Sequence, residues 1–377
     1  DVNDMVKTKV GEINSIATQV QQLNRQIYSA ELDGNTANDL RDQRGVLVDR
    51  LSKIVNIEAS EVVAGKLPSG KDDKHFVITI SGKALIDHFD MSKLSATARK
   101  GKMNEEDVQN LYEVGWADGN TLEIKGGELK GCLDVRDGNE GEVVGPDYVG
   151  NVGKSPIYKG IPYYQKKMNQ FVRTFAMALN EGIINGVDGA GHADGYGIDP
   201  DGSGPLTAAT DIRFFTMLGT DGKPQSTSDF LSAAGTIEEK YKNVTAKNFA
   251  VSSDIMEDYN KIAASDDPNQ SGNIENLNQL LKMRHNTQMF TEGAPEDFMK
   301  SLVATLGIDA QQAIRISANQ QVIVKQVDNR RLADSGVSID EEMANLVKFQ
   351  HAYNASAKMI QTMSEVYDTL TNKLGLR

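Results

Sequence analysis

A short glycine-bounded segment, Gly65–Lys71, has the spacing of a loop that cradles phosphate groups. In such a loop, backbone N–H groups and a lysine surround the phosphates, and the eighth residue is a serine or threonine that holds magnesium. Here the eighth residue is Asp72, whose carboxylate would repel a phosphate, and residues 74–80 predict a strand where the motif needs a helix. We therefore interpret the segment as part of a β-hairpin with a polar loop over 65–74.

A second segment, Asp199–Ser203, resembles the first positions of a calcium-binding loop, in which side-chain oxygens alternate along the chain. The twelfth position of that loop should be a glutamate that binds through both oxygens, and here it is Thr210. An aspartate- and glycine-rich turn is the simpler interpretation. A secreted calcium-binding module or a hydrolase that uses this loop is an alternative hypothesis for the function.

The histidines and the cysteine give no sign of a reactive centre. The five histidines lie far apart in the sequence, and no two have the spacing that places metal ligands on one helix face. Cys132 is the single cysteine, which excludes disulfides within the chain and a cysteine-rich metal site. We expect Cys132 to be buried in a strand rather than reactive.

Carboxylates that stand close together could serve as an acid and a base, but the chain is acidic. Such clusters are usually solvated faces, which is our interpretation of Asp134 with Asp137, Asp266 with Asp267, and Glu105–Asp107. The sequence also contains no nucleophile elbow, zinc-protease helix or dinucleotide-binding fingerprint. We therefore expect no enzyme: no catalytic residue, no metal ligand and no cofactor.

The overall composition narrows the possible partners. The 377 residues include 40 lysines and arginines against 53 aspartates and glutamates, a net charge of −13, so we expect no nucleic-acid partner. No apolar run approaches the ~18 residues of a membrane helix, and no signal peptide heads the chain. The chain begins with Asp1 and is already in a helical pattern, from which we expect residues upstream.

The first secondary-structure element that the sequence predicts covers residues 2–30. There Val6, Ile13, Val20 and Ile27 form a heptad pattern, because they recur every seven residues. This pattern predicts either a coiled coil or an ordinary helix buried in a bundle. A second helix is expected over 38–55, with Leu47, Leu51 and Ile54 on one face and the charged residues mostly outward, including Arg41, Arg44 and Arg50.

Residues 57–145 have the texture of a small β unit. Segments 57–63 and 76–80 predict strands, and 121–124 and 129–135 could form two more around Gly126-Gly127. Helices are expected over 163–184, 274–290 and 295–332, with a mixed segment at about 206–253.

The last helix, over 339–374, repeats the heptad logic, and Ser338 to Glu341 form a capping box at its start. Its apolar stripe runs almost to the chain end, so the helix needs a partner along its length. The residues that we expect to form this interface are Leu346, Phe349, Tyr353, Ile360, Met363, Tyr367 and Leu370.

These patterns predict an α+β protein, mainly α. A long helical bundle or coiled-coil body would be built from both ends of the chain, with a small antiparallel β unit inserted. The expected parts are 1–56 (helical), 57–145 (β-rich), 146–337 (the rest of the helical body) and 338–377 (the C-terminal helix).

Two segments at opposite ends carry a family resemblance. The run Leu40-Arg-Asp-Gln-Arg44 lies in the segment 38–57 after a heptad helix, and Ser335–Met363 contains the capping box and the apolar stripe. Together with Gly127-Glu-Leu-Lys-Gly131 and the helix after it, they resemble the bacterial flagellar hook-associated protein 1 family, the hook–filament junction proteins. Rod and hook proteins end similarly, so another axial subunit is an alternative, against which the Arg41–Arg44 run argues.

This resemblance implies a structural axial protein that joins the hook to the filament, with no catalytic residues. The implied partners are the hook protein, the next hook-associated protein and further copies of the chain, with an export chaperone on the C-terminal inner-tube helix. The resemblance also implies an extracellular place in the flagellum, after export through the flagellar type III apparatus without a cleaved signal peptide. Compared with the family, we expect an N-terminal segment to be missing and an outer β domain at 217–253 to be reduced.

Overall fold

A computed structural model of the chain describes residues 1–32, 34–149, 153–198, 212–270, 272–335 and 339–373. They divide into two units, Asp1–Met299 and Lys300–Arg377, and each unit is described by itself. No helix among the described residues is both long enough and apolar enough to span a lipid bilayer. The expected boundaries at 56, 145 and 337 stay predictions.

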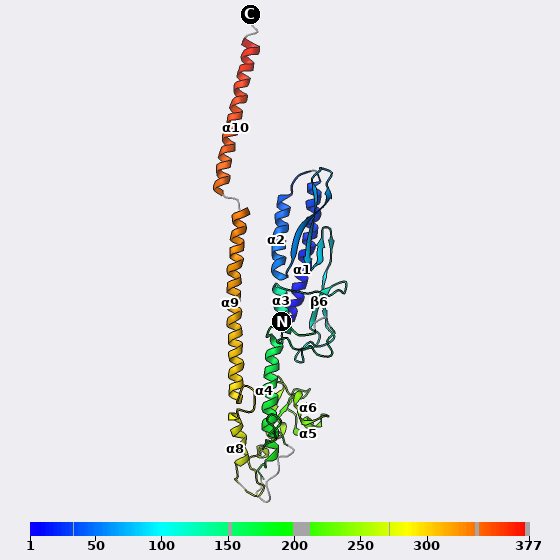
Figure 1. Cartoon of the computed structure of the whole chain (residues 1–377), viewed down its shortest axis with the longest axis vertical. Coiled ribbons are helices and arrows are strands. Elements are labelled where there is room, and N and C mark those ends of the chain that lie inside the picture. The colour runs from blue at the N-terminus through cyan, green and yellow to red at the C-terminus, as the bar shows by residue number, and fades with distance from the viewer. Residues whose placement is uncertain (33, 150–152, 199–211, 271, 336–338, 374–377) are drawn as a thin grey trace. The chain divides into compact units, whose positions relative to one another are not determined.

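The first unit begins with two long helices, α1 (Val2–Glu31) and α2 (Asn38–Ile54), which lie side by side as the sequence predicts (Figure 1). The heptad residues of α1 are covered within this unit: Val6, Ile13, Val20 and Ile27 are at most 4% exposed. The structure thus has the ordinary buried helix, one of the two alternatives that the heptad pattern left open.

The β unit covers the apolar face of α1. Strands β1 (Glu58–Lys66), β2 (Asp72–Ile80), β3 (Lys83–Asp87) and β4 (Asp90–Met91) form an antiparallel sheet in sequence order, and β5 (Leu94–Ala98) pairs with β6 (Tyr112–Trp116). Their inward side chains join α1 and α2 in one core that includes Ile13, Leu51, Ile78, Leu85 and Trp116.

Two asparagines fix α1 against these strands. Asn14 donates to the carbonyl of Leu94 at 2.8 Å and accepts from the N–H of Leu94 at 2.9 Å. Asn24, which is 2% exposed, donates to the carbonyl of His88 at 2.8 Å. A buried amide must keep its hydrogen bonds, so these contacts specify where along the sheet the helix lies.

The predicted loop over 65–74 is too long, because β1 extends to Lys66 and β2 already begins at Asp72. Only a tight turn separates them, closed by the N–H of Leu67 donating to the carbonyl of Lys71 at 2.8 Å. The β-hairpin interpretation of the phosphate-loop spacing is confirmed, because a strand follows the turn in place of the helix that the motif needs.

The strands predicted over 121–124 and 129–135 are wrong. Residues 121–125 form no strand, and Glu128–Asp137 form a helix, α3, whose Leu129 and Cys132 pack on the α1 core. Spacings of three or four residues between apolar side chains favour a helix here. The chain enters α3 through Gly127 at φ 89°, where a Cβ would lie 2.5 Å from the carbonyl oxygen of Ile54.

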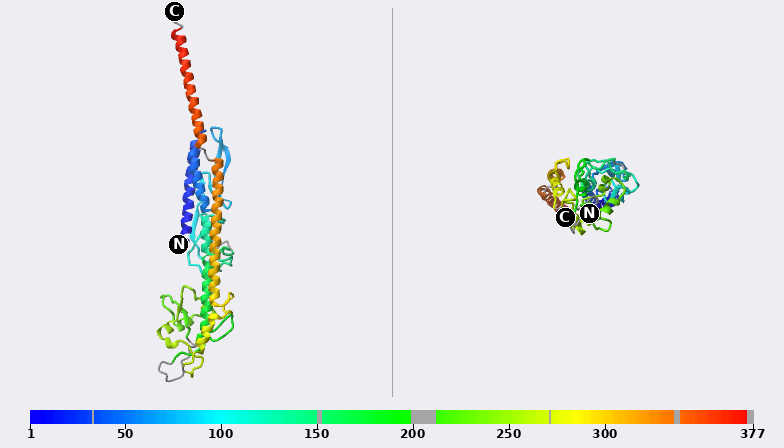
Figure 2. Two further views of the ribbon diagram at one scale, coloured as in Figure 1. Left: turned by 90° about the vertical axis from the view of Figure 1, so that its left-hand side faces the viewer. Right: turned by 90° about the horizontal axis from the view of Figure 1, so that it is seen from below.

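A second core surrounds the helix α4 (Ile161–Glu181). Pro162 lies in its first turn, and Gly182 caps its end in the left-handed conformation. Val172 and Ala176 of α4 pack against Phe230, Tyr241 and Val244. These come from segments that lie beside α4 (Figures 1 and 2). The small elements of this region are β7 (Phe215–Met217), α5 (Thr227–Ser232), α6 (Ile237–Lys242), β8 (Phe249–Val251) and α7 (Ser253–Glu257).

The helix predicted over 274–290 is shorter than expected: α8 (Glu275–Lys282) is followed by a 3-10 turn, Met283–His285. Two further 3-10 turns, His192–Asp194 and Tyr259–Lys261, lie in the same region. The long helices after it are α9 (Pro295–Ser335), which starts in the first unit, and α10 (Ile339–Asp368), with a π-helical turn over Thr369–Lys373. Both agree with the helices that the sequence predicts.

An ionic cluster ties the two N-terminal helices to the sheet. Arg41 contacts both carboxylate oxygens of Glu31, at 2.7 and 2.8 Å, and also reaches Glu61 on β1 at 2.7 Å. Arg44 donates to Glu61 at 2.7 Å and lies over the ring of Phe76. Burial would raise the pKa of the Glu61 carboxyl, but the hydrogen bond from Arg44 and the charge of Arg41 outweigh it and lower that pKa.

The prediction that Arg44 faces outward is therefore wrong: the residue is 7% exposed. Its guanidinium enters the core because Glu61, Asn24 and Phe76 together offer it a negative charge, a hydrogen-bond acceptor and an aromatic face.

Replacing Arg44 by alanine is expected to lower the free energy of unfolding by about 2–3 kcal/mol, because hydrogen bonds to charged groups are lost from a buried position. The matched control is Arg50→Ala on the same helix, where the side chain is 64% exposed and pairs with Glu12. That change should cost less than about 1 kcal/mol. Equal losses for the two variants in urea unfolding would contradict the structural role of Arg44.

A buried histidine in a turn that contacts α4 makes the stability of the first unit sensitive to pH. His192 is fully buried; its Nδ1 lies 3.1 Å from the carbonyl oxygen of Ile212, and its Nε2 accepts from the N–H of Ala263 at 3.0 Å. This pairing fits only the neutral ring protonated at Nδ1. Burial is the main cause that lowers the pKa of His192, and the charge of Arg213 also lowers it.

We expect the protein to lose stability as the pH falls below about 6.5, because the unfolded chain takes up a proton there that folded His192 resists. In His192→Gln this contribution should vanish, so the decrease in stability between pH 7.5 and 5.5 should be smaller than in the wild type. The exposed His285, changed to Gln, is the control and should leave the decrease unchanged. An unaltered decrease in His192→Gln would refute the assignment.

Candidate assembly surfaces

The seven side chains predicted to form an interface are all exposed on α10 and the turn that follows it. Their exposed fractions lie between 58% and 75%, and no residue of α10 is buried. Because they are three, four or seven residues apart, they share one face of the helix. The set is Leu346, Phe349, Tyr353, Ile360, Met363, Tyr367 and Leu370.

The side chains of α9 are also mostly exposed beyond its first turn. No side chain described between residues 300 and 333 is buried, and large apolar groups are exposed along the helix. They include Val303, Leu306, Ile314, Ile316 and Val327. Apolar patches of this extent are rare on monomers and mark sites of interaction. The second unit therefore offers one apolar face with the period of a coiled coil on α10, and further exposed apolar side chains on α9.

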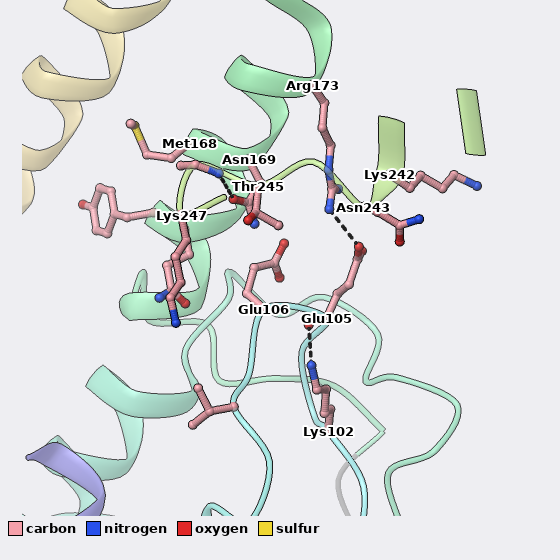
Figure 3. A pocket seen from close by; sticks show the side chains of 14 residues that line it. Lys102, Glu105, Glu106, Met168, Asn169, Arg173, Lys242, Asn243, Thr245 and Lys247 are labelled. Carbon is pink, nitrogen blue, oxygen red and sulfur yellow. Dashed lines mark hydrogen bonds and ion pairs between the residues drawn. The ribbon is translucent and has the colours of Figure 1, made fainter. Parts of the chain in front are cut away.

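The first unit has a polar recess of about 720 Å³ between the segment 102–108, α4 and the segment 242–247 (Figure 3). Arg173 of α4 reaches Glu105 across it at 3.2 Å, and Lys102 donates to the carbonyl of Glu105 at 3.3 Å. Glu106 also faces this space, and its partial burial is the main cause that raises its pKa. Charged side chains of both signs line the recess, and Glu105 is held there by Arg173.

Two of the carboxylates expected on solvated faces are buried in ion pairs instead. Asp107 pairs with Arg99 at 2.6 Å, and Asp137 pairs with Arg99 at 3.1 Å and with Arg136 at 2.6 Å. All four side chains are at most 6% exposed. Two arginines and two aspartates compensate one another, so the cluster cross-links the loop at 99–107 to the end of α3. The charges are arranged for structure rather than for acid–base chemistry.

Several residues that the sequence singled out lie elsewhere in the fold. Asp266 accepts from Asn273, and Asp267 accepts from Asn269 and Gln270, as acceptors in a loop do. Cys132 is a free, half-buried thiol on a helix rather than in the expected strand.

The calcium-loop candidate, Asp199–Ser203 with Thr210, lies outside the described residues, so that hypothesis stays a prediction. Ser338 of the expected capping box lies outside them as well.

The sequence reasoning missed one grouping, in which Asp73, His75 and His88 come together at one end of the sheet. The histidines are 13 positions apart, so no helical spacing links them. The available signal was the β-hairpin itself, because antiparallel pairing of β2 with β3 sets His75 beside the turn that holds His88.

Comparison with known families completes this picture. A model of the flagellar hook-associated protein FlgK helical domain matches residues 1–196, just over half of the chain. The chain belongs to this FlgK family. A second family model, of the C-terminal part of the flagellar basal body rod FlgEFG proteins, matches residues 329–374, which contain α10. The family resemblance of the sequence is confirmed, and with it the prediction of a flagellar structural protein.

Named relatives agree with this family. The chain is 27% identical over 382 residues to flagellar hook-associated protein 1 of Bacillus subtilis, covering 98% of this chain and 66% of that protein. It is 27% identical over 411 residues to flagellar hook-associated protein 1 of Salmonella typhimurium, covering 98% of this chain and 71% of that protein. The chain thus spans about two thirds of the length of these relatives.

Among solved structures, the flagellar hook junction protein FlgK from Burkholderia pseudomallei shares 18% identity at a TM-score of 0.32, over 57% of this chain and 31% of that one. The alternative of a hook or rod subunit is not favoured by the FlgK helical-domain match, which accounts for the N-terminal half.

The exposed helices generate a prediction for the isolated monomer. Limited trypsin digestion should cut within residues 300–377 before it cuts α1, α2 or α4, because helices without buried side chains open readily. Mass spectrometry of the fragments measures the order of cleavage. If residues 339–373 resist trypsin in a chain shown to be monomeric by light scattering, the apolar face does not need a partner.

Proposed function

We propose that this chain is a structural axial subunit that joins the flagellar hook to the filament, and that the apolar face of α10 is its main assembly surface. The observation that carries the proposal is the row of seven exposed apolar side chains along this helix. Burying each would contribute about 1.5–3 kcal/mol, so a partner helix would be held firmly. The match of this helix to a C-terminal model of rod and hook-type flagellar proteins supports an axial position.

The proposed partners are further copies of the chain, the hook protein and the next hook-associated protein. A helix with heptad spacing packs by inserting each side chain into a hole on a neighbouring helix, which suits repeated subunits around a common axis. Before export, an export chaperone would cover the same face, since an uncovered apolar helix self-associates. The proposed place of the assembled protein is extracellular, in the flagellum, and its role is mechanical rather than catalytic.

Acidic substitutions in this face test the proposal. In the flagellated bacterium that encodes this protein, with the gene deleted, the wild-type gene should restore swimming and a copy carrying Ile360→Asp with Met363→Asp should fail to do so. Filament subunits should then be released into the medium, because two charges cannot enter an apolar helix interface. Swimming on soft agar and the protein content of the medium are the measurements.

The matched control places the same two charges on the other side of the same helix turn. At about 100° per residue, Gln361 and Thr362 lie away from the apolar face, so Gln361→Asp with Thr362→Asp should swim normally. Both variants must be present in the cells at wild-type amount. Normal swimming by the Ile360 and Met363 variant would refute the proposed surface, as would an equal loss in the control.

A further inference from the structure

Two histidines from different parts of the sheet lie against each other. His75 is on β2, and His88 is in the turn between β3 and β4; their rings stack with centroids 3.8 Å apart and planes 2° from parallel. The carboxylate of Asp73 lies 3.6 Å from Nε2 of His75. One nitrogen or oxygen from each of the three residues lies within 4.8 Å of the other two. Three possible metal ligands therefore converge at this end of the sheet.

The buried ring of His88 lacks a hydrogen-bond partner. The residue is 8% exposed, and neither Nδ1 nor Nε2 has a partner within the described structure. A buried polar atom without a partner is destabilising, so each one needs an explanation. Aromatic side chains surround the ring: Tyr28 meets it edge-on at 5.9 Å, and Phe89 lies 3.7 Å away. Neither of these side chains forms a hydrogen bond with a nitrogen of His88.

The fold holds His88 in this position through its backbone. The backbone of His88 has φ 52°, in the left-handed region that residues other than glycine rarely adopt. Its N–H donates to the carbonyl of Phe76 at 3.0 Å, and its carbonyl accepts from buried Asn24 at 2.8 Å. His75 and Asp73, in contrast, are half-buried and can turn. One ligand is thus fixed and two are adjustable.

A cavity of about 20 Å³ lies beside this group, and both Asp73 and His88 border it. Its size suits one water molecule or one ion and excludes an organic ligand. Two cations also border it, Arg44 and Lys74, but Glu61 lies 2.7 Å from Arg44 and 3.9 Å from Lys74. Their charge is thereby partly offset.

We propose that Asp73, His75 and His88 bind one divalent transition-metal ion of the zinc class. Two imidazole nitrogens and one carboxylate oxygen are a donor set that zinc accepts, with a water as the fourth ligand. The imidazoles select against Mg²⁺ and Ca²⁺, which prefer oxygen. Tetrahedral coordination brings ligand atoms to about 3.4 Å from one another, so His75 must turn out of the stack towards the fixed ring. The ion would join β2 to the β3–β4 turn and give one of the two unpartnered nitrogens of His88 a ligand bond.

This proposal is independent of the flagellar role and is tested on the whole chain. The chain is stripped with a chelator, exchanged into chelator-free buffer and titrated with Zn²⁺ in a calorimeter, with Mg²⁺ in a parallel experiment. We expect one saturable equivalent of Zn²⁺ and none of Mg²⁺. The Tm should rise with the logarithm of the Zn²⁺ concentration, because a ligand that binds only the folded state stabilises it by mass action.

Two variants and one control locate the ion. His75→Gln and Asp73→Asn change half-buried side chains, so the fold should persist, and each should weaken Zn²⁺ binding at least tenfold. The control is His285→Gln, an exposed histidine elsewhere in the same unit, which should bind like the wild type. Absence of saturable Zn²⁺ binding by the wild type would overturn the proposal. Unchanged affinity in both variants, or loss of binding in the control, would overturn it equally.

Discussion

Burial of the apolar stripe of α1 is the constraint on which the first unit depends. Ile13 and Val20 of this helix are completely buried, and the strands that cover them supply Ile78 and Leu85. Asn14 and Asn24 add directional contacts to this non-directional burial, so the helix has one position along the sheet. The α10 stripe has the same period, but its apolar side chains stay exposed within the chain. One pattern thus makes a core in α1, and in α10 it makes the exposed face that we propose as the assembly surface.

The residues that carry the family resemblance near the N-terminus have a structural use. In the run Leu40-Arg-Asp-Gln-Arg44, the two arginines reach Glu31 and Glu61, and so connect the helix pair to the first strand. A lysine would not replace Arg41, since only the planar guanidinium can meet both oxygens of Glu31 and still reach Glu61. The motif is therefore explained by the geometry of the helix–sheet junction.

The distribution of polar and apolar groups also suits a structural subunit. Ion pairs such as Arg99 with Asp107 are buried in the first unit, where they link segments, while the second unit exposes large apolar side chains such as Phe349. Buried ion pairs specify one arrangement of segments, and exposed apolar faces gain stability only on assembly. The proposed metal site belongs to the first unit, where the ion would join β2 to the β3–β4 turn.

The sequence by itself determined the long helices, the first β-hairpin, the family and the apolar row of α10, because periodic burial leaves a periodic pattern. Contacts between segments, which a periodic pattern does not encode, were decided by the tertiary structure. It made α3 from residues that also suited a strand. It placed Arg44, Asp107 and Asp137 in the interior, where Glu61 meets Arg44 and Arg99 meets both aspartates. It also brought His75 to His88, because strand pairing sets which side chains meet and no local spacing records it.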